Sequence, residues 1–189
     1  MIRCACLAVV LFGLQQQPQE SGLFTSFKGK TPPEIASDKD QWVNGGEEPL
    51  QLAKLKNKVV WLQFGFSGCN GCKAMRPNLV KWQKDYAEKG LVIIEVFNAA
   101  MDKKAGGVKK FAEREKLAYS VLWDKETKNG LAYGIKATPT AYLIDVDGRV
   151  VWEGQPQADP AAREKVIAVQ LERIKKDEKK PEKKEEPKK

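Results

Sequence analysis

Histidine is absent from all 189 residues of the sequence. Histidine is the usual base that activates a serine or cysteine nucleophile, and its imidazole is the commonest metal ligand in proteins. Its absence excludes catalytic triads, cysteine nucleophiles activated by histidine, and metal sites that need an imidazole. We therefore expect no bound metal, and nothing in the sequence calls for another cofactor.

Cysteine is scarce as well. The four cysteines form two close pairs, Cys4 with Cys6 and Cys69 with Cys72. A structural zinc site needs four soft ligands, and the body of the chain offers neither cysteine nor histidine to complete one around the second pair. A zinc role for Cys69 and Cys72 is therefore disfavoured.

Positive charge is in excess, with a formal net charge of +8 at pH 7, but it is not arranged for nucleic acid. The last fifteen residues, 175–189, hold eight lysines and five acids and so carry part of this excess. The rest of the chain shows no basic stripe interleaved with aromatic residues. We expect no nucleic-acid partner.

The N-terminal end differs in composition from the middle of the chain. Residues 1–17 carry a single basic residue, Arg3, ahead of an apolar run from Cys4 to Leu14, which predicts a secretory signal peptide. The run is too short for a membrane-spanning helix of about 20 apolar residues. The protein is therefore expected to be extracytoplasmic, periplasmic or secreted; a disordered, incidentally apolar N-terminus is the alternative.

Two further segments have little apolar content. Residues 18–30, rich in Gln, Gly, Ser and Lys, predict a linker. Residues 177–189 are a Lys/Glu/Pro mixture without any apolar residue, and predict a disordered tail because no buried surface offsets its ordering entropy. The tail is interpreted as a solubilising extension, with weak association to an anionic membrane surface or to cell-wall polymer as the alternative.

Between residues 31 and 176, apolar runs of strand length alternate with segments of helical periodicity. Strand-like runs are 58–64, 91–97, 119–123, 140–146 and 149–152, and helical segments are 69–89, 107–116, 128–133 and 160–176. Asp147-Gly148 predicts a hairpin between the last two strands. The order predicts one α/β domain, 31–176, with helices on both faces of a mixed central sheet. The protein is expected to be a monomer.

The segment Cys69-Asn70-Gly71-Cys72 lies where an expected strand gives way to an expected helix. The unpaired N–H groups and positive dipole of a helix N-terminus favour the thiolate over the thiol, and two intervening residues allow the sulfurs to bond reversibly. This predicts a redox-active disulfide in which Cys69 is the attacking nucleophile and Cys72 is the resolving thiol. An inert structural disulfide between the same residues is the alternative.

A second motif, Thr138-Pro139-Thr140, precedes the strand at 140–146. With the strand KVVWLQF before Cys69-x-x-Cys72-Lys73, with Pro77, and with YGIKATPTAYLIDVDGRVVWEG at 133–154, it resembles the thioredoxin superfamily, most closely its TlpA/ResA-like secreted branch. The resemblance extends from about residue 30 to residue 176.

This resemblance implies a thioredoxin fold and an extracytoplasmic thiol-disulfide oxidoreductase. Its partners would be protein thiols or disulfides of exported proteins, together with an upstream redox partner. A non-catalytic thioredoxin-like binding module with a structural disulfide is the alternative, and either direction of electron flow is compatible with the motif.

The resemblance also assigns roles to residues outside the cysteine pair. Pro139 would be a cis-proline packed beside Cys69 and Cys72, and Thr138 would flank the sulfurs. Their loop would present its backbone to the substrate peptide. Pro77 should kink the helix, because proline lacks the N–H that a helix interior needs.

The chain departs from the family pattern where protons are handled. The buried acid at the end of the first strand corresponds to Gln63, and Met75 stands where ResA-like proteins place a glutamate. Gly65 and Gly68 replace aromatic residues ahead of the first cysteine. Without a buried base near Cys72, deprotonation of that thiol and turnover as a reductase should be slow.

Glu95 is the only acid inside an apolar run, 91–97. The favoured interpretation places its side chain in solvent at a sheet edge. A catalytic carboxylate in the core is the less favoured alternative.

Overall fold

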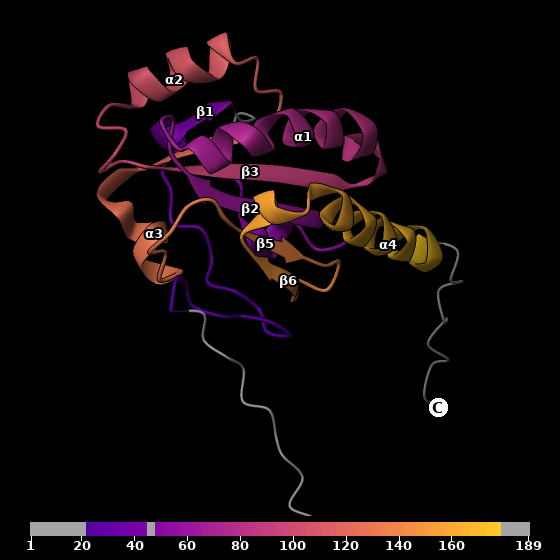
Figure 1. Cartoon of the computed structure of the whole chain (residues 1–189). Helices are drawn as coiled ribbons and strands as arrows, with labels where there is room; N and C mark the ends of the chain where they lie inside the picture. The colour runs from indigo at the N-terminus through magenta and orange to yellow at the C-terminus, as the bar shows by residue number, and fades with distance from the viewer. Residues whose placement is uncertain (1–21, 45–47, 179–189) are drawn as a thin grey trace, which may run out of the picture.

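Residues 22–44 and 48–178 are described by the computed structural model (Figure 1). The expected signal peptide at 1–17, residues 18–21 of the expected linker and residues 179–189 of the expected tail lie outside these ranges. The last described helix ends at Glu178, two residues beyond the end that the sequence predicts.

Six strands form one sheet in the order β1-β4-β3-β2-β5-β6. Their bounds are β1 Trp42–Asn44, β2 Val59–Gly65, β3 Leu91–Asn98, β4 Ser120–Asp124, β5 Thr140–Ile144 and β6 Val150–Gly154. β2 and β4 are parallel to β3, whereas the β1·β4, β2·β5 and β5·β6 pairs are antiparallel. The expected mixed sheet is confirmed. The edge strand β1 escapes sequence analysis because three residues carry no readable period.

Every residue of the central strand β2 is buried. Successive side chains of a strand point to opposite faces, so Val59 and Trp61 enter one core while Val60 and Leu62 enter another. A strand covered on both sides needs apolar residues at both parities, which explains why KVVWLQF shows no polar alternation.

Helices cover both faces of the sheet, as expected. α1 (Asn70–Tyr86), α2 (Ala105–Arg114) and α4 (Pro160–Glu178) contribute Leu79, Phe111 and Ile167 to the core that contains Trp61. The short α3 (Lys128–Ala132) lies away from α1 and α2 (Figure 1), and the residue that ends it, Tyr133, is buried in the other core.

The described part of the expected linker belongs to the folded domain, so the expectation of a linker is wrong for residues 22–30. The Thr25 N–H donates to the Tyr133 carbonyl at 3.0 Å, and the Gly29 N–H donates to the Val150 carbonyl at 2.8 Å. The Phe24 ring meets the Tyr142 ring edge-on, with centroids 5.8 Å apart. Phe24 and Phe27 of this segment pack against the core that contains Tyr133. The polar composition of the segment did not indicate this packing.

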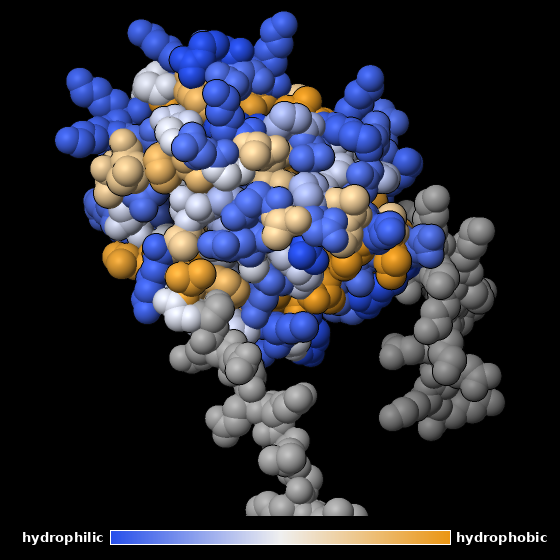
Figure 2. All heavy atoms as spheres, in the orientation of Figure 1, coloured by the Kyte–Doolittle hydropathy of each residue, from blue (hydrophilic) through white to orange (hydrophobic). Residues whose placement is uncertain are grey.

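Hydrophilic side chains predominate on the face that Figure 2 shows, where hydrophobic ones gather only in small patches. The large hydrophobic residues that are well exposed in the described chain are Leu23, Met101, Leu131 and Val169. None of the helices within 22–44 and 48–178 is both long and apolar enough to cross a membrane.

Candidate redox site

Cys69 and Cys72 are joined by a disulfide at the N-terminus of α1. Cys69 is the N-cap residue, with extended backbone, and its Sγ accepts a hydrogen bond from the Cys72 N–H at 3.1 Å. The sulfur thus satisfies one of the N–H groups that the start of a helix leaves unpaired. The same group stabilises negative charge on Cys69 when the pair is reduced.

Only one of the two cysteines borders the surface pocket at this site. Cys72 is completely buried, whereas Cys69 keeps 4% of its surface exposed and lines an open pocket of about 230 Å³. The pocket also carries basic side chains from α1 and α2, including Lys73 and Arg114. Of the two cysteines, Cys69 is therefore the one that can be reached through this pocket.

The Thr138–Pro139 loop lies against the first turn of α1, and its peptide bond is cis. A Cβ atom on Gly71 would lie 2.7 Å from Pro139 Cδ, closer than side chains tolerate. Gly71 is therefore the residue that lets the proline ring pack beside the cysteine pair. The cysteine pair and Pro139, which sequence analysis expected to form one site, are therefore close together in the fold.

Asp102 fixes the loop that leads into the cysteine pair, a role that sequence reasoning missed. Its carboxylate accepts hydrogen bonds from the Ser67 N–H at 2.8 Å and from the Ser67 hydroxyl. The Asp102 carbonyl in turn accepts a hydrogen bond from the Trp123 indole at 2.7 Å. No local pattern predicts this contact, because Ser67 follows β2 whereas Asp102 follows β3.

Pro77 lies inside α1, as expected. Its nitrogen has no hydrogen to donate to the Lys73 carbonyl, so one rung of the helical ladder is missing one turn beyond Cys72.

The structure corrects the expectation for Glu95. Its side chain is completely buried rather than exposed at an edge, because β3 is an interior strand and Glu95 shares the parity of Ile93 and Phe97, which face α1. Gln63 is its partner in register on β2, so Glu95 lies one strand away from the position of the missing family acid.

Three side chains bind the Glu95 carboxylate. The Tyr119 hydroxyl donates to Oε2 at 2.8 Å, and longer contacts to Oε1 come from Gln63 at 3.4 Å and Arg76 at 3.5 Å. Arg76 is 5% exposed and packs its guanidinium over the rings of Phe97 and Phe111. Glu95 is thus an anchored carboxylate with a charged partner on the redox helix.

Burial raises the pKa of Glu95 above its ordinary value, and the charge of Arg76 and the hydrogen bond from Tyr119 oppose that rise. Burial and the neighbouring carboxylate raise the pKa of Tyr119, which stays protonated and acts as a donor. A carboxyl with a raised pKa near a cysteine pair is a candidate for proton exchange with that pair.

Gly65 lies close to both the Glu95 carboxylate and the buried Cys72 sulfur. Because it has no side chain, it leaves space next to both groups. A Cβ atom built on Gly65 would lie 2.8 Å from Cys72 Sγ and 3.4 Å from Glu95 Oε1. A buried carboxylate therefore lies near Cys72, where sequence analysis expected none. Local sequence could not reveal the contact, because it depends on the pairing of β2 with β3.

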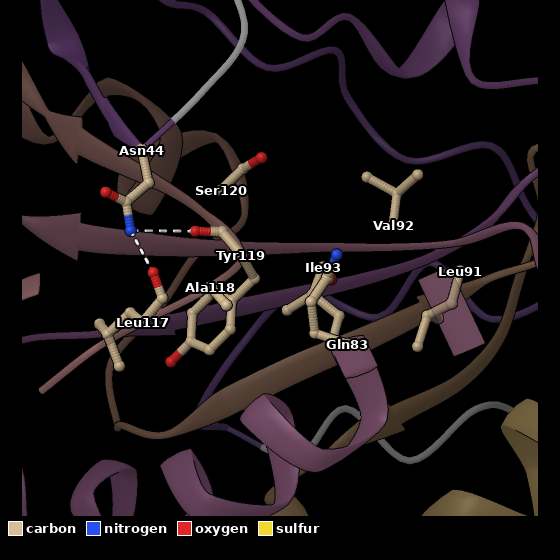
Figure 3. Close-up of a pocket in the computed structure, with 9 residues that line it drawn as sticks. All are labelled: Asn44, Gln83, Leu91, Val92, Ile93, Leu117, Ala118, Tyr119 and Ser120. Carbon is tan, nitrogen blue, oxygen red and sulfur yellow. Dashed lines mark hydrogen bonds between the residues drawn. The ribbon is translucent and has the colours of Figure 1, made fainter. Parts of the chain in front are cut away.

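A second open pocket, of about 450 Å³, lies where β3 and β4 begin (Figure 3). Tyr119 and Asn44 line it, and the Asn44 side chain donates to the carbonyls of Leu117 and Tyr119. It contains neither cysteine nor carboxylate. Within the residues that the structure describes, no cluster of three or more His, Cys, Asp or Glu side chains could hold a metal ion.

A disulfide at a helix N-terminus, a cis-proline loop packed against it and a mixed sheet beneath both are the marks of the thioredoxin-fold thiol-disulfide oxidoreductases. Residues 24–184 match the Redoxin family, and the chain belongs to that family.

Known proteins with similar sequences and structures support this assignment to the family. The chain is 31% identical over 139 residues to thiol-disulfide oxidoreductase ResA of Bacillus cereus, covering 68% of this chain and 76% of ResA. It is 32% identical over 112 residues to protein DipZ of Mycobacterium tuberculosis, but this match spans 58% of this chain and only 16% of DipZ. A crystal structure of a candidate thiol:disulfide interchange protein DsbE from Chlorobium tepidum has a TM-score of 0.65 and 29% identity, covering 76% of this chain and 97% of that chain.

The expected fold and the resemblance to the TlpA/ResA-like branch are confirmed. The described domain is a thiol-disulfide oxidoreductase domain.

Proposed function

We propose that this protein exchanges the Cys69–Cys72 disulfide with cysteines of exported proteins outside the cytoplasm. The observation that carries the proposal is the position of Cys69, which caps α1 and borders the open pocket. Cys72, in contrast, is completely buried. The extracytoplasmic location rests on the composition of residues 1–17 and on the similarity to the secreted branch of the superfamily.

The exchange proceeds through a mixed disulfide. In the reducing direction, the Cys69 thiolate attacks a client disulfide, one client sulfur leaves as a thiolate, and a Cys69–client bond forms. Cys72 then attacks Cys69 Sγ, which releases the second client thiolate and restores the Cys69–Cys72 bond. The client gains two electrons, and an upstream dithiol partner must return them to this domain; the reverse sequence oxidises a client.

Thr138 and Pro139 bind the client in this proposal. Their loop packs on Gly71, between the two cysteines, so that its backbone groups can align an extended client peptide beside Cys69. The protein acts as a monomer, and the Lys/Glu/Pro tail adds at most weak attachment to a membrane surface.

Trapping of clients tests the proposal in cells that make the full chain. Cys72→Ser should accumulate mixed disulfides through Cys69 with exported proteins, and reductant should release them. Cys69→Ser is the matched control and should trap nothing. Clients trapped only by Cys69→Ser would reverse the assigned roles, and clients confined to the cytoplasm would refute the location.

A further inference from the structure

Resting on the proposed exchange, we propose that Glu95 is the proton acceptor for the Cys72 thiol, and that Tyr119 and Arg76 position its carboxylate. The geometric basis is the space at Gly65, where one added Cβ atom would lie within 3.4 Å of both Cys72 Sγ and Glu95 Oε1. Glu95 takes the place of the acid that the family pattern puts on the neighbouring strand, where this chain has Gln63.

A purely structural reason for Glu95 is weak on energetic grounds. Removing a carboxylate and a guanidinium from water is costly, and apolar residues of similar volume commonly stabilise a core as well or better. The contact between Arg76 and Glu95 is long, at 3.5 Å, and the Arg76 Nε is buried without a partner among the described residues. Such a costly polar cluster in the apolar layer beneath α1 is explained by a function.

No other described carboxylate can serve Cys72 from within the core. The remaining buried acids are Asp124 and Asp145. Asp124 accepts hydrogen bonds from the backbone at the start of α3, and Asp145 accepts them in the hairpin that joins β5 to β6. Both carboxylates are committed to these turns, whereas the Glu95 carboxylate borders the same space at Gly65 as Cys72 Sγ.

Glu95 acts at the second step of the exchange. When a client sulfur is bonded to Cys69, the Cys72 S–H proton passes to the Glu95 carboxylate and the resulting thiolate attacks Cys69 Sγ. The bond from Cys69 to the client breaks, its electron pair leaves with the client sulfur, and the proton on Glu95 passes to that thiolate or to water. The first step, attack by Cys69, does not use Glu95.

The charged and titratable groups that face Glu95 are Arg76 and Cys72 from α1 and Tyr119 from the residue before β4, and Gln63 of β2 is a neutral donor. The Tyr119 hydrogen bond stabilises the charged carboxylate, so its removal raises the pKa of Glu95. Tyr119 is therefore a positioning residue: its loss should shift the pH dependence of the attack by Cys72 without abolishing that attack.

A two-step kinetic assay isolates the proton transfer. The reduced protein is mixed with 2,2′-dithiodipyridine, and release of pyridine-2-thione is followed in stopped flow across about pH 5 to 9. Attack by Cys69 releases the first thione, and attack by Cys72 on the mixed disulfide releases the second. Glu95→Gln should leave the first phase unchanged and slow the second by about 100-fold near pH 7, the contribution expected of a general base.

Two further variants make the result specific. Tyr119→Phe should move the pH midpoint of the second phase upward while the plateau rate persists, and this test holds even if Glu95→Gln folds poorly. Glu164→Gln is the matched control, because Glu164 also pairs with a basic side chain of α1, Lys81, but on the surface. It should leave both phases unchanged.

A second phase in Glu95→Gln with the wild-type rate and pH profile would overturn the assignment of Glu95, and an unmoved midpoint in Tyr119→Phe would overturn that of Tyr119. A wild-type protein that releases neither thione under these conditions would instead refute the underlying exchange function.

Discussion

Gly71 and Pro139 are in direct contact across the redox site: a side chain on the glycine would place its Cβ 2.7 Å from the proline Cδ. One residue between the two cysteines thus touches the loop that the proposed function assigns to client binding.

Gly71→Ala is predicted to push the proline loop away from the cysteines. Exchange with a protein substrate such as insulin should fall about tenfold or more, because a displacement near 1 Å misaligns reacting groups. The first thione phase with the small disulfide should fall less, since that probe does not depend on the loop. Gly106→Ala is the control: it also lies in a helix, has nothing within 4 Å of its Cβ position, and should raise helix stability slightly.

Gly65→Ala is predicted to disturb the buried sulfur directly. The added methyl would lie 2.8 Å from Cys72 Sγ, so the core must shift, at a cost of about 1–3 kcal/mol in the free energy of unfolding. It would also stand between the sulfur and Glu95 and slow the second thione phase. Urea unfolding of the oxidised protein measures the first effect. Unaltered stability together with an unaltered second phase would show that the space at Gly65 has no importance.

Glu95 should also leave a signature in the pH dependence of stability. Because burial raises its pKa in the folded protein above the value near 4.5 of the unfolded chain, the folded state binds more protons than the unfolded state above that pH. The stability that Glu95 contributes is therefore fully present below pH 4.5 and is lost as the pH rises through its folded pKa. Glu95→Gln lacks this titration.

Urea unfolding of the oxidised wild type and of Glu95→Gln across about pH 4 to 8 tests this sign. The free energy of unfolding of the wild type minus that of the variant should fall with pH, by up to about 1.4 kcal/mol per pH unit. A difference that stays constant would mean that Glu95 keeps its ordinary pKa in the fold.

Sequence reasoning succeeded where the signal is local. The seven buried residues of β2, the cysteine pair at the start of α1 and the Asp147-Gly148 hairpin each follow from a continuous stretch of chain. It failed where contacts are distant in sequence. The burial of Glu95 depends on β3 being an interior strand, and the packing of residues 22–30 depends on a surface formed by β5, β6 and Tyr133.

Asn129 of α3 provides a stability test that is separate from the redox chemistry. The Asn129 side chain donates to the Ala36 carbonyl at 2.8 Å and to Asp124 at 2.9 Å, and it accepts from the Ala36 N–H at 2.9 Å. Asn129→Ala should lower the free energy of unfolding by about 2–3 kcal/mol, because it removes these bonds and leaves buried groups unpaired. Lys128→Ala, an exposed neighbour on α3, should change it by less than about 0.5 kcal/mol. Equal effects of the two substitutions would contradict the importance of the Asn129 contacts.

A redox titration of the Cys69–Cys72 pair tests the central claim most directly. The purified protein is equilibrated in dithiol/disulfide buffers of known potential, the free thiols are alkylated, and the oxidised fraction is measured. The account predicts a midpoint within the range of known exchange proteins, about −120 to −270 mV. A pair that stays oxidised below about −300 mV would behave as a structural disulfide and contradict the proposed function.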